Sequence, residues 1–392
     1  MQKLTLKDLD VTSKRVLVRV DFNVPLKDGS VANDIRIRAA LPTIKYLLEN
    51  RARIILMSHM GRPKGKPDPA LRMDCVAQAL SSVLGIKVQK IDTCVGPEAE
   101  QAAAALPEGG ILLLENVRFY PEETANDPEF SRQLASLADI YVNDAFGSAH
   151  RAHASTAGVA AYLPSAMGFL LEKEVSIMGR ALEEPARPFA AVIGGVKIAD
   201  KIGVLTNLLK KVDFLLIGGG MANTFLKAQG LDMGRSVVED EKLEKALEIL
   251  KAAGNNGVQL VLPVDLVVAG EISPDAQRQV VPVTAVPPDM MALDIGPETA
   301  QKYAEIIAPV KTVIWNGPMG VFEQEAFAKG TEAVAQAVAG VELSIVGGGD
   351  SAAAVEKVGV ADRITHISTG GGASLEFLEG KILPGIAALT DK

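Results

Sequence analysis

The chain has 392 residues, of which 48% are hydrophobic and 22% are charged. This length is enough for two domains with their own cores, and the composition argues against intrinsic disorder. The net charge is −8, and the excess of acid lies in the second half: residues 1–165 carry 20 Lys and Arg against 19 Asp and Glu, and the remainder 20 against 29. An acidic chain is a poor general nucleic-acid binder, because duplex affinity depends on neutralising phosphates over an extended face.

Membrane insertion and export are also disfavoured. The longest apolar stretches have the length of strands, well short of the ~20 residues that cross a bilayer. The first residues, MQKLTLKDLD, lack the apolar core of an export signal. Two cysteines, Cys75 and Cys94, are too few for a disulfide framework. We therefore expect a cytoplasmic protein with free thiols and no membrane contact.

In the first half, short β-rich runs alternate with helical patterns. We expect strands at Val16–Asp21, Arg53–Ser58, Ile111–Leu114 and Ile140–Val142, and helices at Ile35–Asn50, Ala70–Leu84 and Glu98–Ala105. Near-continuous apolar strands separated by helices predict a parallel sheet that is covered on both faces.

The alternation pauses at residues 163–188, where the helical stretch Gly168–Glu184 is closed by Pro185 and Pro188. This segment is typical of an interdomain connector. Strands resume at Phe189–Ile193, Phe214–Ile217, Gln259–Leu262, Val313–Trp315, Ser344–Val346 and Ile364–Ile367. The valine- and proline-rich residues 264–288 predict a small antiparallel excursion.

The predicted fold is therefore α/β, with two doubly wound, Rossmann-like parallel-sheet domains joined by a hinge helix. We expect a first domain at residues 1–165, a connector at 166–187 and a second domain at 188–379.

Polar and basic side chains follow the strands of the first half. In open α/β sheets ligands bind beyond the carboxyl ends of the strands. The residues at these positions are Asp21, Asn23, His59, Arg62, Arg118 and the group 143–153, and Arg36 opens the first helix. One such residue is more often a solvated loop charge, but recurrence at four strand ends predicts an anion site, for which arginine is well suited. His150 and His153 could equally stitch a loop, and His366 is better explained as a packed strand residue.

Glycine clusters follow the strands of the second half, which contains all three Gly-Gly-Gly runs. In GGVKIADKIG (194–203), Lys197 and Lys201 share one helical face if both are helical, although two solvated lysines are the commoner outcome. In VGGGDSAA (346–354), Asp350 and Ser351 open a helix, where backbone amides favour a phosphate and a carboxylate can hold a cation. An ordinary helix cap is the alternative there.

The commonest nucleotide fingerprints are missing from the sequence: it has no GxxxxGK[ST], no protein-kinase catalytic set and no GxGxxG. Basic side chains at one edge and glycines at another still indicate two phosphorylated ligands in separate crevices. Such a chain is a candidate for phosphoryl transfer between them.

A series of motifs in the same order closely resembles the phosphoglycerate kinase family. They are RVLVRVDFNVP, SHMGRP, ENVRF, NDAFGSAHRAHAS, GGVKIADKI, GGGMANTF, LDIGP, WNGPMGVFE, GGGDS and STGGGASLEFLEGKILPG. The resemblance spans nearly the whole chain. It implies reversible phosphoryl transfer between 1,3-bisphosphoglycerate and ADP, giving 3-phosphoglycerate and ATP with Mg²⁺. It also implies a monomer whose last residues, 380–392, fold back onto the first domain.

The resemblance assigns site residues one by one. The 3-phosphoglycerate site would comprise Asp21, Asn23, Arg36, His59, Arg62, Arg118 and Arg151. The nucleotide site would comprise Lys201, Glu323, Gly348, Gly349, Asp350 and Ser351, with Asp350 bearing the metal. The adenosine pocket would comprise Gly195, Gly219, Leu293, Asn316, Pro318 and Val321, and Lys197 would lie beside the transferring group.

The expected chemistry needs no general base, because the nucleophile in the ATP-consuming direction is a carboxylate that is already ionised near neutral pH. It needs alignment and charge neutralisation, which we expect from Arg36, Lys201, Lys197 and the amides around Gly348 and Gly349. These groups come from different domains, so catalysis should require closure about the connector. The alternatives are a Rossmann-type dinucleotide oxidoreductase and a non-catalytic phosphometabolite sensor.

Overall fold

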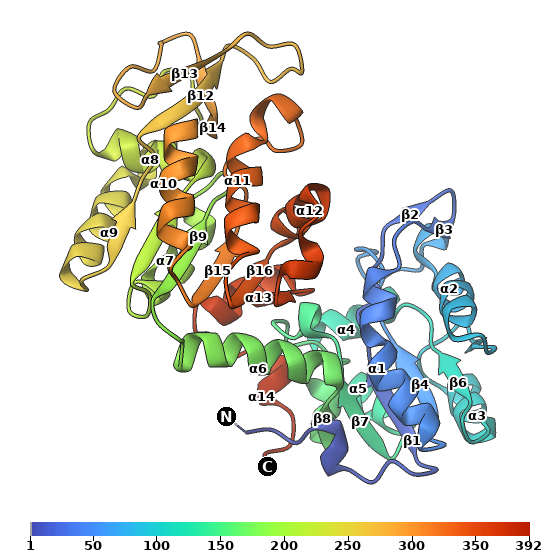
Figure 1. Cartoon of the computed structure of the whole chain (residues 1–392). Coiled ribbons are helices and arrows are strands. Elements are labelled where there is room, and N and C mark those ends of the chain that lie inside the picture. The colour runs from blue at the N-terminus through green and yellow to red at the C-terminus, as the bar shows by residue number, and fades with distance from the viewer. Residues whose placement is uncertain (1) are drawn as a thin grey trace. The chain divides into compact units, whose positions relative to one another are not determined.

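The computed structural model describes residues 2–392, which form two compact units (Figure 1). The first unit runs through Ser176 and also contains Ile382–Lys392, and the second is Ile177–Lys381. The boundary between them falls inside one helix, α6 (Phe169–Glu183), so this helix contributes to both units.

The first unit is built on a six-stranded, fully parallel sheet. In spatial order its strands are β5 (Gln89–Lys90), β6 (Ile111–Leu113), β4 (Arg53–Met57), β1 (Arg15–Arg19), β7 (Ile140–Asn143) and β8 (Ser165–Met167). A short hairpin, β2 (Leu26–Lys27) and β3 (Ser30–Val31), follows β1. Strands β4, β5 and β6 lie on one side of β1, and the later strands β7 and β8 lie on its other side. The strand order therefore reverses at β1, and ligand crevices form at such switch points.

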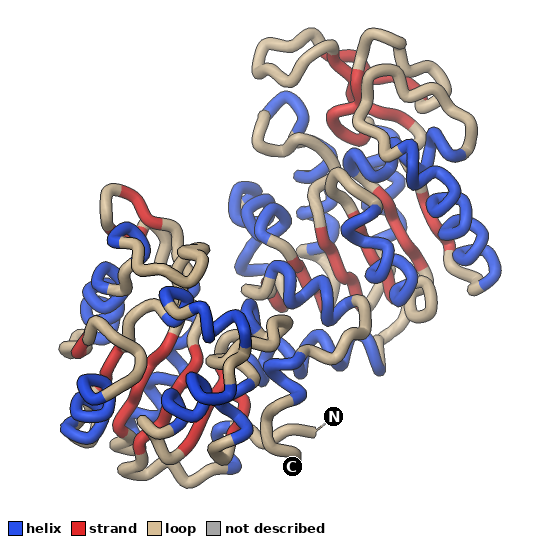
Figure 2. Tube along the Cα trace, turned by 180° about the vertical axis from the view of Figure 1, so that it is seen from behind, coloured by secondary structure: helices blue, strands red, loops and turns tan. Residues whose placement is uncertain are grey.

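Helices supply the covering layers of the first unit (Figure 2). They are α1 (Ile35–Glu49), α2 (Asp74–Leu84), α3 (Pro97–Ala105), α4 (Pro121–Ala125), α5 (Pro128–Ala135) and the start of α6, with 3₁₀ turns η1 (Leu6–Asp8), η2 (Pro69–Leu71), η3 (Val117–Phe119), η4 (Phe146–Ser148) and η5 (Gly158–Ala161). Val16 and Val18 of β1 and Ile54 of β4 are fully buried. Apolar residues of this kind favour a strand that is covered on both faces.

The end of the chain belongs to the first unit. Helix α14 (Pro384–Ala387) lies there, and the side-chain amide of Asn143 donates to the carbonyl of Gly385 at 2.9 Å. The ammonium of Lys3 donates to the carbonyls of Ala387 and Leu389 at 2.8 and 2.7 Å. These bonds join residues more than 240 positions apart in the chain, so the first unit closes only after synthesis of the second.

The second unit has its own parallel sheet, whose strands follow the order typical of dinucleotide-binding folds. That order is β11 (Gln259–Val261), β10 (Phe214–Ile217), β9 (Phe189–Ile193), β15 (Thr312–Asn316), β16 (Leu343–Gly347) and β17 (His366–Ile367). The switch point lies between β9 and β15.

Helices and one small sheet complete the second unit. The helices are α7 (Ile202–Leu208), α8 (Gly219–Ala228), α9 (Leu243–Asn255), α10 (Pro297–Ile307), α11 (Lys329–Val338), α12 (Gly349–Val358) and α13 (Gly371–Leu378), with 3₁₀ turns η6 (Ala199–Lys201), η7 (Asp240–Lys242), η8 (Glu325–Phe327) and η9 (Ala361–Arg363). An antiparallel sheet has the order β13 (Arg278–Pro282), β12 (Asp265–Ala269) and β14 (Met291–Ile295), which confirms the predicted excursion.

Three local predictions were wrong or incomplete. The edge strands β5 and β8 were missed, because two or three residues are too short to show a pattern. The helix expected from Ala70 begins at Asp74, because the amide of Met73 donates to the Glu115 carboxylate instead of continuing η2. Lys197 is not helical, so it and Lys201 do not share a helical face.

Two global expectations can be compared directly with the structure. Cys75 and Cys94 are free thiols. Among the described residues no helix is both long and apolar enough to span a membrane.

Candidate functional site

The loops beyond β1, β4 and β6 converge at the carboxyl edge of the first sheet. Gly61 is their meeting point: its amide donates to the side-chain oxygen of Asn23 at 2.8 Å, and its carbonyl accepts from the guanidinium of Arg118 at 2.9 Å. Arg36, in the first turn of α1, donates to the Asp21 carboxylate at 3.1 Å. The structure thus brings together four of the predicted glycerate-site residues through a few direct contacts.

Positive charge accumulates at this edge. Burial, together with Arg19 and Arg151, lowers the pKa of Arg118 to about 10. Arg62 and Arg151 are exposed, and neither side chain has an ion-pair partner within residues 2–392. Uncompensated cations close to one another repel, so the edge favours a bound anion.

His59 is buried at the centre of these cations and is held by a residue that sequence reasoning missed, Arg19. The guanidinium of Arg19 lies 3.1 Å from Nδ1 of His59, and since arginine can only donate, Nδ1 is the acceptor. Burial, followed by the charges of Arg19 and Arg118, holds the pKa of His59 well below its ordinary value. The ring is therefore neutral, with its proton on Nε2.

The buried carboxylate of Glu123 is linked to Arg19 through the Ser155 hydroxyl. Nε of Arg19 donates to the Ser155 hydroxyl at 2.7 Å, and that hydroxyl donates to Glu123 at 2.6 Å. The Glu123 side chain is fully buried and also accepts from the Ser155 amide at 2.9 Å. His153 lies 3.6 Å from this carboxylate, so its position fits the loop-stitching alternative.

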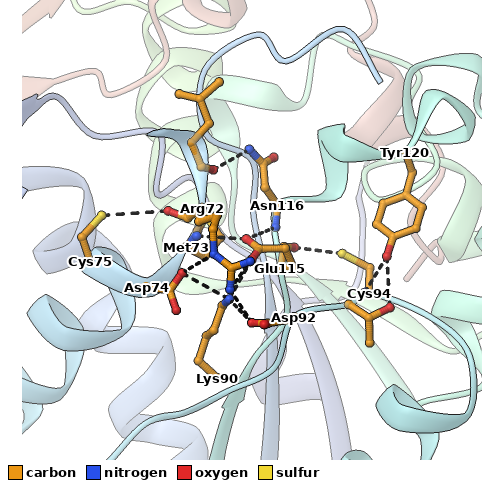
Figure 3. A network of polar contacts seen from close by, with 12 residues as sticks. Arg72, Met73, Asp74, Cys75, Lys90, Asp92, Cys94, Glu115, Asn116 and Tyr120 are labelled. Carbon is orange, nitrogen blue, oxygen red and sulfur yellow. Dashed lines mark hydrogen bonds and ion pairs between the residues drawn. The ribbon is translucent and has the colours of Figure 1, made fainter. Parts of the chain in front are cut away.

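Two residues of the ENVRF motif, Glu115 and Asn116, hold the far end of the loop that carries His59 and Arg62. Figure 3 shows these two side chains. The side-chain amide of Asn116 donates to the carbonyls of Met60 and Leu71 at 2.8 and 3.0 Å. The buried carboxylate of Glu115 accepts from the amide of Met73 at 2.9 Å.

Glu115 is in turn part of a charged network (Figure 3). Its second oxygen accepts from the ammonium of Lys90 at 2.7 Å, and Arg72 lies 3.6 Å away. Asp74 and Asp92 pair with the same two cations nearer the surface. Removing Lys90 would take the closest cation from the buried Glu115 carboxylate, so this pair helps to fix the loop.

At the second sheet, the loops after β9 and β15 meet across the switch point. The amides of Gly194 and Gly195 donate to the carbonyls of Asn316 and Pro318 at 2.9 and 3.0 Å. The Lys201 ammonium is buried beneath them and donates to Gly194 O, Asn316 O and Asn316 Oδ1 at 2.8, 3.0 and 2.7 Å. Burial lowers the pKa of Lys201 to about 8.

The start of α12 adjoins this crevice. Gly348 and Gly349 open the helix with Asp350 exposed in its first turn. Ser351 is buried, and its hydroxyl accepts from the Gly317 amide at 2.6 Å, so it ties the two loops together. Helix amides and dipole at this end favour a phosphate.

An apolar cavity of about 200 Å³ lies beside Gly195 and Gly219. Of the six residues predicted for an adenosine pocket, Gly195, Gly219, Leu293, Pro318 and Val321 line it, whereas Asn316 lies beside Lys201 instead. Glycine is required at Gly219, where φ is +67° and a Cβ would stand 2.6 Å from the carbonyl of Gly195. Lining residues that were missed include Asn223, Val237, Ile272, Met291 and Met319. Lys197 and Glu323 are exposed and do not line this cavity.

Two further carboxylates in the second unit were missed. Glu239 is buried and accepts from the amides of Ile198 and Ala199, which fixes the loop leading to Lys201. Asp294 lines the cavity and accepts from the amides of Ile295 and Gly330 at 2.9 and 2.7 Å. Burial raises the pKa of Asp294 to about 7. The sequence does not indicate which backbone amides will donate to an acidic side chain near a turn, so neither residue could be assigned this role in advance.

These two edges define the class of the chain: an α/β protein of two units, with a cation-rich edge on one sheet and a glycine-rich edge beside an apolar cavity on the other. Comparison with known proteins is decisive on the family. The family model described as phosphoglycerate kinase matches residues 6–381. Phosphoglycerate kinases of Moorella thermoacetica and Pelotomaculum thermopropionicum are 66% and 56% identical, with 100% of each chain covered.

Solved structures agree. The chain is similar to phosphoglycerate kinase from Coxiella burnetii (TM-score 0.91, 47% identity) and from Pyrococcus horikoshii OT3 (TM-score 0.86, 36% identity), in each case over 98% of both chains. The chain belongs to the phosphoglycerate kinase family. It is accordingly a phosphotransferase with a carboxyl acceptor, acting between 1,3-bisphosphoglycerate and ADP in glycolysis. The predicted resemblance and fold class are confirmed, and a dinucleotide oxidoreductase is not favoured.

Proposed function

We propose that the carboxyl edge of the first sheet holds 3-phosphoglycerate or 1,3-bisphosphoglycerate. The observation that carries this assignment is the cluster of cations around Gly61, in which Arg62, Arg118 and Arg151 have no carboxylate partner among the described residues. Arg36, Arg62, Arg118 and Arg151 bind the ligand's negative groups, and neutral His59 donates from Nε2. Asp21 and Asn23 complete the site with oxygen acceptors.

The glycine-rich edge of the second sheet holds ADP or ATP. The cavity of about 200 Å³ receives the adenosine, and its apolar walls suit the flat face of a base. The phosphates extend toward the amides of Gly348 and Gly349 at the start of α12. Glu323 accepts from ribose hydroxyls.

The residues present also fit Mg²⁺. One exposed carboxylate, Asp350, stands at a phosphate-binding helix end, and Mg²⁺ bound with a nucleotide needs only one or two protein carboxylates. Among the described residues there is no group of three or more potential ligand side chains that would form a metal cage of its own. When bound, the ion would neutralise negative charge on the phosphate oxygens.

Arg36 and Lys201 stabilise the transferring phosphoryl group, helped by Lys197 and the amides of Gly348 and Gly349. The attacking carboxylate is already ionised, so the protein's contribution is alignment and electrostatic stabilisation. Lys201 reaches the phosphoryl by exchanging one acceptor, the Asn316 side chain, for a phosphate oxygen.

Transfer requires closure, because Arg36 and Lys201 belong to different compact units. We expect small-angle scattering to show a smaller radius of gyration when both substrates are present than when either is present alone. An unchanged radius would exclude the closure mechanism.

A coupled assay with 3-phosphoglycerate and MgATP tests the assignment. We expect turnover with 3-phosphoglycerate and very slow ATP hydrolysis without it. A sensor on the same fold would bind both ligands without turnover, and an oxidoreductase would instead bind a nicotinamide cofactor in a fluorescence titration.

We also propose that the chain works as a cytoplasmic monomer, as its free thiols and acidic charge suggest. Sedimentation at micromolar concentration and cell fractionation would test these two points.

A further inference from the structure

The second unit contains another cavity, of about 820 Å³, that none of the functional assignments uses. It lies among α10, α11 and the strands β12 and β13. Its lining shares only Ile295 with the adenosine pocket, so the two cavities are distinct. A volume in this range is typical of small-molecule sites.

Small side chains on two neighbouring helices create the space. Ala300 and Ala304 of α10 and Gly330 and Ala333 of α11 line the cavity, and the three alanines are only half-buried. A side chain cannot be added at Gly330, where a Cβ would stand 2.3 Å from the Ile295 side chain. Apolar surface is therefore left open between two packed helices, a state that burial of an apolar ligand would stabilise.

Val267 and Val280 extend the apolar lining on the strand side, and Pro274 and Pro297 extend it at the ends. The body of the cavity is thus made mainly of alanine, valine, isoleucine and proline, with Gln279 and Gln301 as its uncharged polar side chains. Most of the contact that it offers to an occupant is dispersion.

The charged groups are Arg278, Lys329 and Glu325. Lys329 is paired with Glu332 at 2.7 Å. Arg278 has no carboxylate partner among the described residues, and its guanidinium makes one hydrogen bond there, to the Ala326 carbonyl at 3.4 Å. A guanidinium beside an apolar cavity is suited to binding a carboxylate through two parallel hydrogen bonds.

We propose that this cavity binds a small apolar molecule with one carboxylate, whose body lies between α10 and α11 and whose carboxylate pairs with Arg278. An aromatic acid with two fused rings is a suitable probe, because it is rigid and loses little conformational freedom on binding.

Isothermal titration of 2-naphthoate into the full chain tests the proposal, with MgADP at saturation so that the adenosine pocket is filled. We expect one site with a Kd below about 1 mM. The neutral analogue 2-naphthamide should bind at least about tenfold more weakly, because it lacks the charge-assisted contact. No saturable binding, or binding that MgADP abolishes, would overturn the proposal.

Two variants locate the probe. Arg278→Ala should weaken naphthoate to the level of the amide, and Ala304→Leu should fill the cavity and abolish binding of both. Arg363→Ala, an exposed arginine outside the lining, is the matched control and should bind as the parent does. All three should keep the parent's transferase activity, which shows that they are folded. If Arg278→Ala still bound naphthoate more tightly than naphthamide, the carboxylate would not lie at Arg278. If an active Ala304→Leu variant still bound the probe, the probe would lie outside this cavity.

Discussion

The buried ammonium of Lys201 should give the enzyme an alkaline limit. In the structure its pKa is lowered from 10.5 to about 8, with burial as the leading cause. One pKa unit corresponds to about 1.36 kcal/mol, so burial disfavours the charged form by roughly 3 kcal/mol. The ammonium still holds three acceptors at 2.7–3.0 Å, which keeps it protonated near neutral pH.

The measurable consequence is a fall in kcat/KM for MgATP as the pH rises through about 8, since this quantity reports ionisations of the free enzyme. One unit above an apparent pKa only about a tenth of the groups remain protonated. With 3-phosphoglycerate at saturation, kcat/KM at pH 9 should therefore be about tenfold below its value at pH 7.

Lys201→Arg is the control, because a guanidinium stays protonated throughout this range. Its kcat/KM should be lower than the parent's at pH 7 but flat up to pH 9.5. A parent profile that is flat to pH 9.5 would refute the reasoning. So would an alkaline limb in Lys201→Arg at the same pH, since that limb would belong to another group.

Four further predictions concern single side chains. Arg36→Ala should lower kcat by about 10² or more without changing the circular dichroism spectrum, and a loss of a few-fold would contradict its role in charge stabilisation. Arg19→Met leaves the buried Glu123 without its cation, so the free energy of unfolding in urea should fall by about 3–5 kcal/mol. Adding Glu123→Gln should recover most of that loss, whereas additive losses would show that the two do not interact. Glu239→Ala frees two backbone amides before Lys201, so kcat/KM for MgATP should fall about tenfold while KM for 3-phosphoglycerate stays constant; an equal change in both would indicate general unfolding. Asp294 has a pKa of about 7 when folded against 3.8 as the ordinary value, so its contribution to stability is present below pH 4 and lost as the pH rises through about 7. Asp294→Asn should remove that decline from the unfolding free energy measured at pH 4 to 8, and an unchanged pH dependence would show that the group titrates normally.

The parallel sheets were predictable because their strands are long apolar runs. Residues such as Val16 and Ile54 have no exposed surface, and a run of them between helical patterns has few other interpretations. The edge strands β5 and β8 were not predictable, since two or three residues carry no period. The start of α2 was misplaced because a carboxylate 42 residues away captures the Met73 amide, which no local pattern encodes.

The grouping of the proposed site residues was predictable for a similar reason: strand ends bring distant residues to one edge, so their order in the sequence is enough. Arg19 shows where this reasoning stopped. It stands inside a valine-rich strand, and an arginine with no exposed surface must find hydrogen-bond partners. That signal was present in the sequence, but its partners, Ser155 and His59, lie 136 and 40 residues away.

Buried carboxylates support the loops at both edges, and the sequence did not reveal them, although it did reveal which residues lie at the strand ends. Glu123 balances the cation that orients His59, and Glu239 holds the amides that precede Lys201. The carboxylate oxygens of both residues find their donors only in the tertiary structure. Burying either carboxylate without a partner would cost several kcal/mol of folding free energy. A residue that meets the ligand is constrained by the ligand's chemistry, which is visible in residue type. A carboxylate that accepts from a backbone amide is constrained by the fold instead. Its supporting role can be recognised only once the position of that amide is known.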